Sequence, residues 1–400
     1  MTKLMQTLVA GALLAGSAVI AADNMEAYRH GAWETLVQAT RKSDDISLRE
    51  MDLQIPNSGS AHVRYSMNAA NGSLVLILSG TFATADNPYS NDLGRELMNA
   101  GYGVVEMDSF VSTRFVTQMR QGAPGNLRHE ALLAGQVLQE LIRRTGNKVS
   151  DISVTGVSYG GAVALQMALL DKAGQLPIKL AHVVSFSAPV SFRETMQRLD
   201  DYEDLPYSYD TIVPIVKSAK PNSGVPSGTS TEQLEKVIGR GFRLDLAKAV
   251  DTIDRLYASQ IHPSPAVALG LENLGDPSAP RMEREVESSA IPFRTLFRYW
   301  LAPYWIGKGG IKSESDLLNY GEMSAVLPEL GSNVEVVLTR NDPLNAPGAT
   351  SELEKIQTAA HVTVLPTGGH AGFVRTEQGK SIVNRIFSKT VAVATVERKE

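Results

Sequence analysis

Ser158 is the residue whose surroundings best suit a nucleophile. It lies in the stretch TGVSYGG, residues 155–161, with Gly156 two places before it and Gly160 two places after it. An apolar strand pattern leads directly into this stretch, and a helical pattern follows it directly. A sharp strand-to-helix turn aims the serine oxygen out of a sheet and needs small residues on either side. The pattern therefore predicts a nucleophilic serine, with an ordinary glycine-rich turn as the alternative.

A serine hydroxyl is a poor nucleophile unless a general base lies within reach. His370 is the candidate base, because it follows the last expected strand in the glycine-rich loop PTGGHAGF. The other six histidines lie in helical, strand, cap or hairpin patterns, where structural roles are expected: His30, His62, His129, His182, His262 and His361.

An acid must orient this base and stabilise its charged form. Asp342 lies in the loop NDPLNAP, after another expected strand, and gives the chain order Ser, Asp, His. The alternative interpretation of Asp342 is a turn-forming Asp-Pro pair. The rivals for the role of the acid follow other strands: Asp108, Glu194 and Asp200.

Two backbone N–H groups are expected to hold the oxyanion that develops during attack. The first belongs to Tyr159, at the N-terminus of the helix that follows the nucleophile. The second is expected in the loop LSGTFATADNPY after the first parallel strand, where Thr81 is our choice and Phe82 the fallback.

The elements that must position these residues alternate along the chain. A hairpin is expected from the runs 46–55 and 61–69, and apolar strands follow at 73–79, 102–108, 151–156, 180–187, 333–340 and 361–366. Helical patterns lie at 24–43, 88–100, 126–144, 161–171, 351–358 and 377–388. This alternation predicts an α/β fold with a mostly parallel central sheet and helices on both faces.

The strand–helix rhythm is lost between residues 189 and 330, which are mainly helical in pattern. We expect an α/β core in two parts, 23–188 and 331–400, with residues 189–330 inserted between them as a mainly helical cap.

This order of strands, nucleophile turn, cap, Asp loop and His loop resembles the α/β-hydrolase superfamily over about residues 46–390, the cap excepted. The loop GGHAGF is also similar to the His loop of the YheT-like branch. Many members carry His-Gly after the first parallel strand, where this chain has Ser79-Gly80. The resemblance implies an α/β-hydrolase fold and acyl transfer to Ser158, with His370 taking the hydroxyl proton and returning it to the leaving group.

The expected cap carries an aromatic stretch, IPFRTLFRYWLAPYW, at residues 291–305. Four aromatic side chains recur in it at helical spacing: Phe293, Phe297, Trp300 and Tyr304. This stripe predicts packing of the cap onto the core, or else the lining of an acyl or aromatic pocket or contact with a lipid surface. Arg294 and Arg298 fall on other faces and are expected to be solvated.

The first 22 residues have the pattern of a secretory signal peptide. Lys3 is followed by an uncharged stretch, residues 4–22, that ends in small residues and predicts cleavage after Ala21 or Ala22. A retained membrane anchor is the alternative; after cleavage we expect no stable membrane span. The 400-residue chain has no cysteine, which excludes disulfides, a cysteine nucleophile and a thiolate metal site. A periplasmic or secreted protein is expected.

Charge and composition narrow the classes of partner. The formal net charge is −5, and the chain has no basic run, which argues against nucleic acid as a partner. Acyl transfer through a serine requires no metal or organic cofactor, and we expect none. The expected substrate is a small-molecule or lipid-like ester.

The leading hypothesis is a serine hydrolase of esterase or lipase type that cleaves carboxylic esters. A capped peptidase or amidase using the same triad is an alternative, and it would need a cap carboxylate such as Glu283, Glu285 or Glu287 to hold a free amino terminus. An acyltransferase is also open, as is a catalytically silent binding protein on a hydrolase scaffold.

Overall fold

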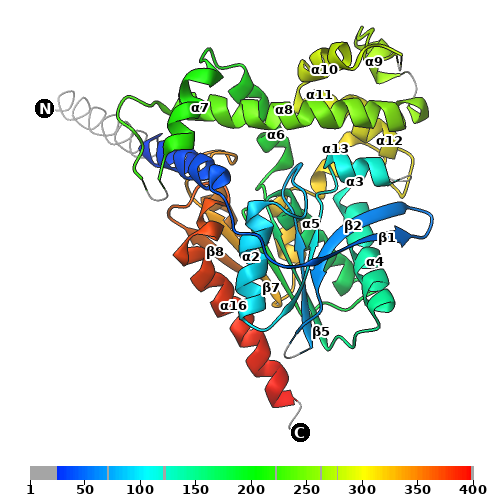
Figure 1. The fold of residues 1–400 in the computed structure, drawn as a ribbon, viewed down its shortest axis with the longest axis vertical. Coiled ribbons are helices and arrows are strands. Elements are labelled where there is room, and N and C mark those ends of the chain that lie inside the picture. Colours follow the sequence, from blue (N-terminus) through cyan, green and yellow to red (C-terminus); the bar gives the residue numbers. More distant parts are fainter. Residues whose placement is uncertain are drawn as a thin grey trace, which may run out of the picture.

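Eight strands form one sheet in the order β1-β2-β4-β3-β5-β6-β7-β8 (Figure 1). The computed structural model describes residues 25–69, 72–119, 123–220, 223–261, 264–276 and 278–397, so the expected signal segment 1–22 and His262 lie outside the described residues. The strands are β1 (Arg49–Ile55), β2 (Gly59–Ser66), β3 (Ser73–Leu78), β4 (Gly103–Met107), β5 (Asp151–Val157), β6 (His182–Phe186), β7 (Val334–Thr339) and β8 (His361–Leu365).

The sheet is mostly parallel, as the alternating pattern predicted. The β1–β2 and β2–β4 pairs are antiparallel, and the pairs from β4 through β3, β5, β6 and β7 to β8 are parallel. The carboxyl ends of six strands therefore meet at one edge, where loops can gather side chains from distant parts of the chain.

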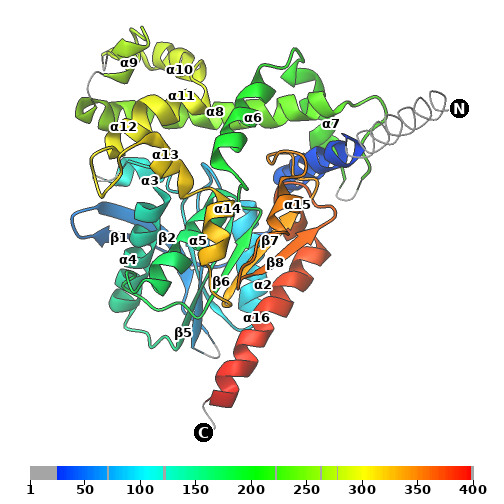
Figure 2. The same cartoon turned by 180° about the vertical axis from the view of Figure 1, so that it is seen from behind.

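Helices cover both faces of the sheet. Helices α2 (Pro88–Asn99) and α16 (Glu377–Glu397) lie on one face, and α4 (Leu127–Thr145) and α5 (Tyr159–Lys172) on the other (Figures 1 and 2). Alternate side chains of β3 reach the two sides: Leu74 and Leu76 join the core under α4 and α5, whereas Val75 and Ile77 join the core under α2 and α16. Burial on both faces explains why these strands read as continuous apolar runs.

The segment between β6 and β7 folds mainly as helices over the carboxyl edge of the sheet (Figure 2). Its helices are α6 (Phe192–Glu203), α7 (Tyr209–Ser218), α8 (Thr231–Tyr257), α9 (Pro265–Ala268), α10 (Arg281–Ser289), α11 (Phe293–Leu296), α12 (Ala302–Trp305), α13 (Glu314–Asn319) and α14 (Met323–Val326). Between α11 and α12, Phe297–Leu301 form a π-helical turn. We call this region the cap; its long helix α8 crosses the top of the molecule in Figure 1.

A helix over residues 25–40 precedes the sheet and lies where the cap meets the core, drawn in blue in Figure 1. Trp33 is buried in the same apolar cluster as cap side chains, and its indole N–H donates to the Ser223 carbonyl oxygen at 2.7 Å. The other described α-helices are α3 (Thr113–Gln118) and α15 (Ala349–Leu353), and short 3₁₀ helices lie at Ala258–Gln260, Leu327–Glu329 and Gly372–Arg375. No helix in the described part of the chain is long and apolar enough to cross a membrane.

Two helices differ most from their expected ranges. The helix expected at 351–358 is shorter and begins earlier, at Ala349, directly after Gly348 in the left-handed region at φ 83°. The last helix continues to Glu397 rather than ending near Ser388, since no proline or glycine follows that would stop it.

Candidate active site

Ser158 joins β5 to α5 in a strained turn. Its backbone has φ 56° and ψ −121°, a combination that residues other than glycine rarely adopt. A Cβ on Gly156 would lie 2.1 Å from the Gly160 carbonyl oxygen, and a Cβ on Gly160 would lie 2.2 Å from the Leu78 carbonyl oxygen. Neither position can carry a side chain, which is the physical reason for the glycine spacing around Ser158.

His370 lies between Ser158 and Asp342. Its Nε2 is 2.8 Å from Ser158 Oγ, and its Nδ1 is 2.8 Å from Asp342 Oδ2. A neutral imidazole that carries its proton on Nδ1 donates to Asp342 and leaves Nε2 to accept from the serine hydroxyl. The structure therefore brings together the three residues that the sequence predicted as nucleophile, base and acid, although they lie up to 212 positions apart.

Asp342 is held on both of its oxygens. It is 1% exposed, and its Oδ1 accepts the Leu344 backbone N–H at 2.8 Å while Oδ2 faces His370. This fixes the direction of the carboxylate toward the imidazole. Among the rivals for the role of the acid, Glu194 is exposed on α6, and its backbone N–H donates to Ser191 Oγ at the start of that helix.

The loop after β3 passes beside Ser158. Thr81 and Phe82 line the same cavity as Ser158, and Phe82 is held in the left-handed region at φ 61°. Asp108, another rival for the acid, is buried at the end of β4 and accepts the Ala85 backbone N–H at 2.7 Å. Asp108 therefore supports this loop, while Thr81 as the second oxyanion donor stays a prediction.

The side chain of Tyr159 is explained by a buried acid that no pattern marked. Its hydroxyl donates to Glu130, with 2.7 Å to Oε2, and Glu130 also accepts the Gly125 N–H at 2.7 Å. Burial raises the pKa of Glu130 to about 7, and burial together with the Glu130 charge raises the pKa of Tyr159. The one available signal was a carboxylate three positions after Leu127, on the apolar face of the expected helix 126–144.

These positions define the fold. The turn after β5 holds Ser158, the loops after β7 and β8 hold Asp342 and His370, and the cap lies between β6 and β7. In α/β-hydrolases the serine occupies such a strand-to-helix turn, and its partners follow in the order Ser, Asp or Glu, His. The chain has the α/β-hydrolase fold.

Comparisons with known proteins give weak likenesses only. No family model and no curated protein matches the chain. Among solved structures, an esterase of Pyrococcus furiosus is 12% identical with a TM-score of 0.46, over 87% of this chain and 95% of that one. A proline iminopeptidase of Mycobacterium smegmatis is 15% identical with a TM-score of 0.42, over 86% and 100%. A carboxyl esterase of Bacillus coagulans is 11% identical with a TM-score of 0.44, over 86% and 99%. At such identities and TM-scores these likenesses add nothing to the fold that the strand order defines.

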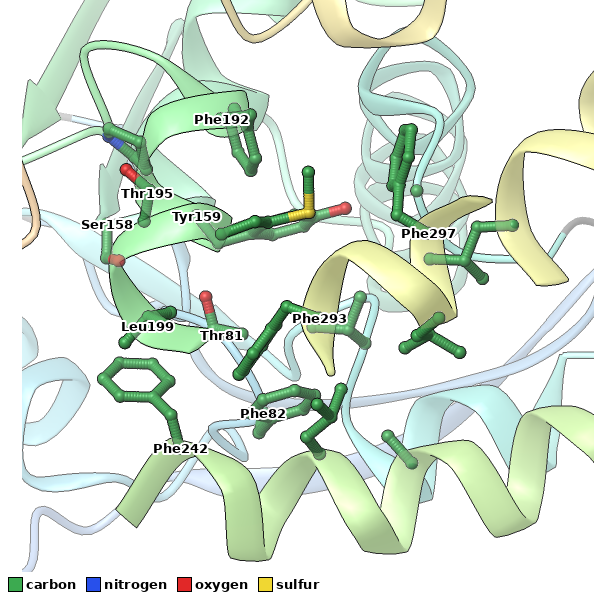
Figure 3. Close-up of a pocket in the computed structure, with 18 of the residues that line it drawn as sticks. Thr81, Phe82, Ser158, Tyr159, Phe192, Thr195, Leu199, Phe242, Phe293 and Phe297 are labelled. Atoms are coloured by element: carbon green, nitrogen blue, oxygen red, sulfur yellow. The ribbon is translucent and has the colours of Figure 1, made fainter. Parts of the chain in front are cut away.

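A cavity opens beside Ser158 and extends between the α/β-hydrolase core and the cap (Figure 3). It encloses about 890 Å³ of empty space, the opening to solvent included. Its wall is almost wholly apolar and includes Leu199, Phe242, Phe293 and Phe297. No charged side chain is among the described residues that line it.

The aromatic stretch of the cap divides into a pair that lines the cavity and a pair that packs inside the cap. Phe293 and Phe297 line the cavity, which favours the pocket interpretation for these two. Trp300 is fully buried and donates its indole N–H to Asp254 of α8 at 2.7 Å, and the buried Tyr304 packs edge-on against Tyr257 of the same helix, so these two serve packing within the cap. The π-helical turn at 297–301 shifts the helical spacing between the two pairs.

Asp200, the third rival for the acid, positions this stretch instead of the base. It is 2% exposed and accepts the Phe293 backbone N–H at 2.7 Å, at the start of α11. It also pairs with Arg294 at 3.0 Å, and Arg298 pairs with Glu314 at 3.3 Å. The two arginine side chains are 50% and 65% exposed, so they are solvated, as expected, and also ion-paired.

The three cap glutamates point away from the cavity lining. Glu287 accepts the Leu274 backbone N–H at 2.7 Å, Glu285 pairs with Arg281 at 2.7 Å, and Glu283 is exposed on α10. None of the three lines the cavity beside Ser158. Within the described residues, no group of three or more His, Asp or Glu side chains is arranged to hold a metal ion.

Proposed function

We propose that the protein is a serine hydrolase that cleaves carboxylic esters through an acyl-enzyme on Ser158. The observation that carries this proposal is the chain of two 2.8 Å hydrogen-bond contacts from Ser158 through His370 to Asp342, at the wall of an apolar cavity. A catalytically silent binding protein would not need this alignment of three buried polar residues.

In the proposed reaction, Ser158 Oγ attacks the ester carbonyl carbon while His370 Nε2 takes the hydroxyl proton. Asp342 holds the imidazole in the required tautomer and stabilises the imidazolium. The Tyr159 N–H and a donor from the loop at Thr81 bind the oxyanion. His370 then gives its proton to the leaving alcohol, and water, activated by the same histidine, attacks the acyl group and releases the acid and free Ser158.

The character of the cavity supports an uncharged, apolar substrate. Removing an aliphatic or aromatic group from water into this wall is favourable, by about 0.8 kcal/mol for each buried methylene group. A peptide with a free amino terminus would bury an unpaired ammonium there, because no acidic side chain lines the described wall. The cavity therefore favours ester hydrolysis over aminopeptidase activity as the proposed function.

The place of action is also part of the proposal. The pattern of residues 1–22 supports export of the chain, and the absence of cysteine is compatible with an oxidising compartment. We propose a periplasmic or secreted enzyme.

A panel of nitrophenyl esters of increasing acyl length, run beside aminoacyl anilides, tests the function. We expect ester hydrolysis that rises with acyl length, little anilide cleavage, and loss of about 10⁴-fold or more of kcat in Ser158→Ala. Ser153→Ala, at a buried serine on β5, the strand that leads to Ser158, is the control and is expected to keep full activity. Preference for anilides, or wild-type kcat in Ser158→Ala, would contradict the proposal.

A further inference from the structure

Thr35, on the helix over residues 25–40, holds the backbone of the proposed base. The His370 backbone N–H donates to Thr35 Oγ1 at 2.7 Å, and the Thr35 hydroxyl donates in turn to the Gly31 carbonyl oxygen at 2.7 Å. Both bonds are buried, so water does not compete for them. The threonine hydroxyl is thus fixed as an acceptor for the residue that must face Ser158.

Glu34, the neighbour of Thr35, joins the His loop to the Asp loop. Its Oε2 accepts the Gly368 backbone N–H at 2.8 Å and the Asn341 side-chain N–H at 3.1 Å. Asn341 Oδ1 in turn accepts the Gly369 backbone N–H at 3.0 Å. The Glu34 carboxylate therefore holds Gly368 directly and also holds Asn341, the residue before Asp342. Asn341 in turn holds Gly369, the residue before His370.

The helix lies too close to both loops to shift without moving them. A Cβ on Gly31 would lie 1.7 Å from the Asn341 carbonyl oxygen, and a Cβ on Gly369 would lie 2.3 Å from the Gly31 carbonyl oxygen. On its other side the helix is anchored to the cap through the buried Trp33. Backbone thus packs on backbone at the point where the Asp and His loops meet.

We propose that the helix over residues 25–40 is a clamp for the catalytic loops, with Thr35 and Glu34 as positioning residues for His370 and Asp342. The inference rests on the proposed function, because the reaction being positioned is acyl transfer to Ser158. A reacting group misplaced by about 1 Å can cost on the order of 10²-fold in rate. Loss of the clamp therefore lowers kcat without touching the apolar cavity that binds substrate.

The test compares three threonine variants on one nitrophenyl ester. Thr35→Val keeps the shape of the side chain but removes the acceptor, and we expect kcat to fall by about 10- to 100-fold with KM within about 2-fold. Thr35→Ser keeps the hydroxyl and is expected to recover kcat to within about 3-fold of wild type. Thr40→Val is the matched control, because its hydroxyl bonds only to Val37 in the same helix.

A second pair of variants covers the case in which Thr35→Val fails to fold. Glu34 is half-buried and tolerates change more readily. Glu34→Ala removes the oxygen that accepts both hydrogen bonds and is expected to lower kcat by about 10-fold, whereas Glu34→Gln keeps one side-chain oxygen as an acceptor and is expected to lose less. Equal kcat values for wild type and the folded variants Thr35→Val or Glu34→Ala would overturn the clamp.

A readout independent of turnover separates the clamp from the proposed function. The proton NMR signal of the His370 Nδ1–H bonded to Asp342 is expected far downfield in the wild type, and to weaken or shift in Thr35→Val but not in Thr40→Val. An unchanged signal in Thr35→Val overturns the clamp. A shifted signal in a protein whose wild type cleaves no ester supports the clamp and contradicts the proposed function.

Discussion

The two walls of the site are built by different forces. On the sheet side, Ser158, His370 and Asp342 are aligned by two hydrogen-bond contacts of 2.8 Å, with Thr35 behind His370. On the cap side, the wall consists of apolar side chains such as Phe242. Hydrogen bonds depend steeply on distance and angle, whereas apolar contacts scale with buried area. The sheet wall is therefore expected to set the rate of the reaction, and the cap wall the choice of substrate.

The largest effect is expected for Asp342, compared with Asp200, a second buried aspartate that supports the opposite wall. Asp342→Asn keeps the size of the side chain but favours the wrong imidazole tautomer, so kcat at neutral pH is expected to fall by about 10³- to 10⁴-fold. Asp200→Asn, behind the cap wall, loses its ion pairs to Arg294 and to the buried Arg243, and its carboxylate at the start of α11. It is expected to raise KM and lower the melting temperature while kcat changes by less than about 10-fold.

Steady-state kinetics on one nitrophenyl ester measures kcat and KM of the Asp342→Asn and Asp200→Asn variants, with circular dichroism as the check of folding. An Asp200→Asn variant that loses as much kcat as Asp342→Asn would contradict the division between the two walls.

Glu130 is a carboxylate buried behind the apolar wall, where it binds the cavity-lining Tyr159, and its raised pKa predicts a stability that depends on pH. Burial raises its pKa from 4.5 to about 7, so between these values the native state holds a proton that the unfolded state has lost. The stability that this proton contributes is complete below about pH 4.5 and is lost as the pH rises to about 7. Burial lowers the pKa of the neighbouring His129, which is present in both wild type and the Glu130→Gln variant compared next.

Glu130→Gln removes the titration but keeps an acceptor for Tyr159. From pH 4.5 to pH 8, the free energy of unfolding of the variant is expected to gain up to about 3 kcal/mol relative to wild type. Urea unfolding of both proteins at several pH values measures the difference. A difference that does not change with pH would show that Glu130 has no raised pKa in the folded protein.

The smallest effect is expected on the cap wall. Phe242→Ala removes an aromatic contact from the cavity, and we expect kcat/KM for a long-chain nitrophenyl ester to fall by about 10-fold while that for the acetate ester stays within about 2-fold. Leu244→Ala, an exposed apolar side chain on the same helix, is the control. Equal losses on both esters would mean that Phe242 acts on the catalytic residues and not on the acyl group.

The features that could be predicted from the sequence are those with a local signal in the chain. Ser158, Asp342 and His370 were predictable because each follows a strand, and the carboxyl ends of parallel strands meet at one edge. The mostly parallel sheet was predictable because strands that are buried on both faces read as continuous apolar runs. The signal in each case is local, so one stretch of chain is enough to find it.

Other parts of the site could not be predicted, because their roles depend on contacts between distant segments. Thr35 and Glu34 read as ordinary polar positions of an amphipathic helix, and only the fold brings them to a loop more than 330 positions away. The cavity wall combines residues from the loop after β3, from α5 and from several cap helices, and a π-helical turn interrupts the aromatic stripe that was its best signal.

The central claim is that Ser158 is a nucleophile activated by His370, and labelling with a fluorophosphonate tests it most directly. Mass spectrometry of the folded wild-type protein is expected to find one adduct, on Ser158, that is absent from Ser158→Ala. Labelling is also expected to slow by orders of magnitude in His370→Ala, because the base is then missing. A folded wild-type protein without an adduct on Ser158, or one labelled equally fast in His370→Ala, would contradict the account.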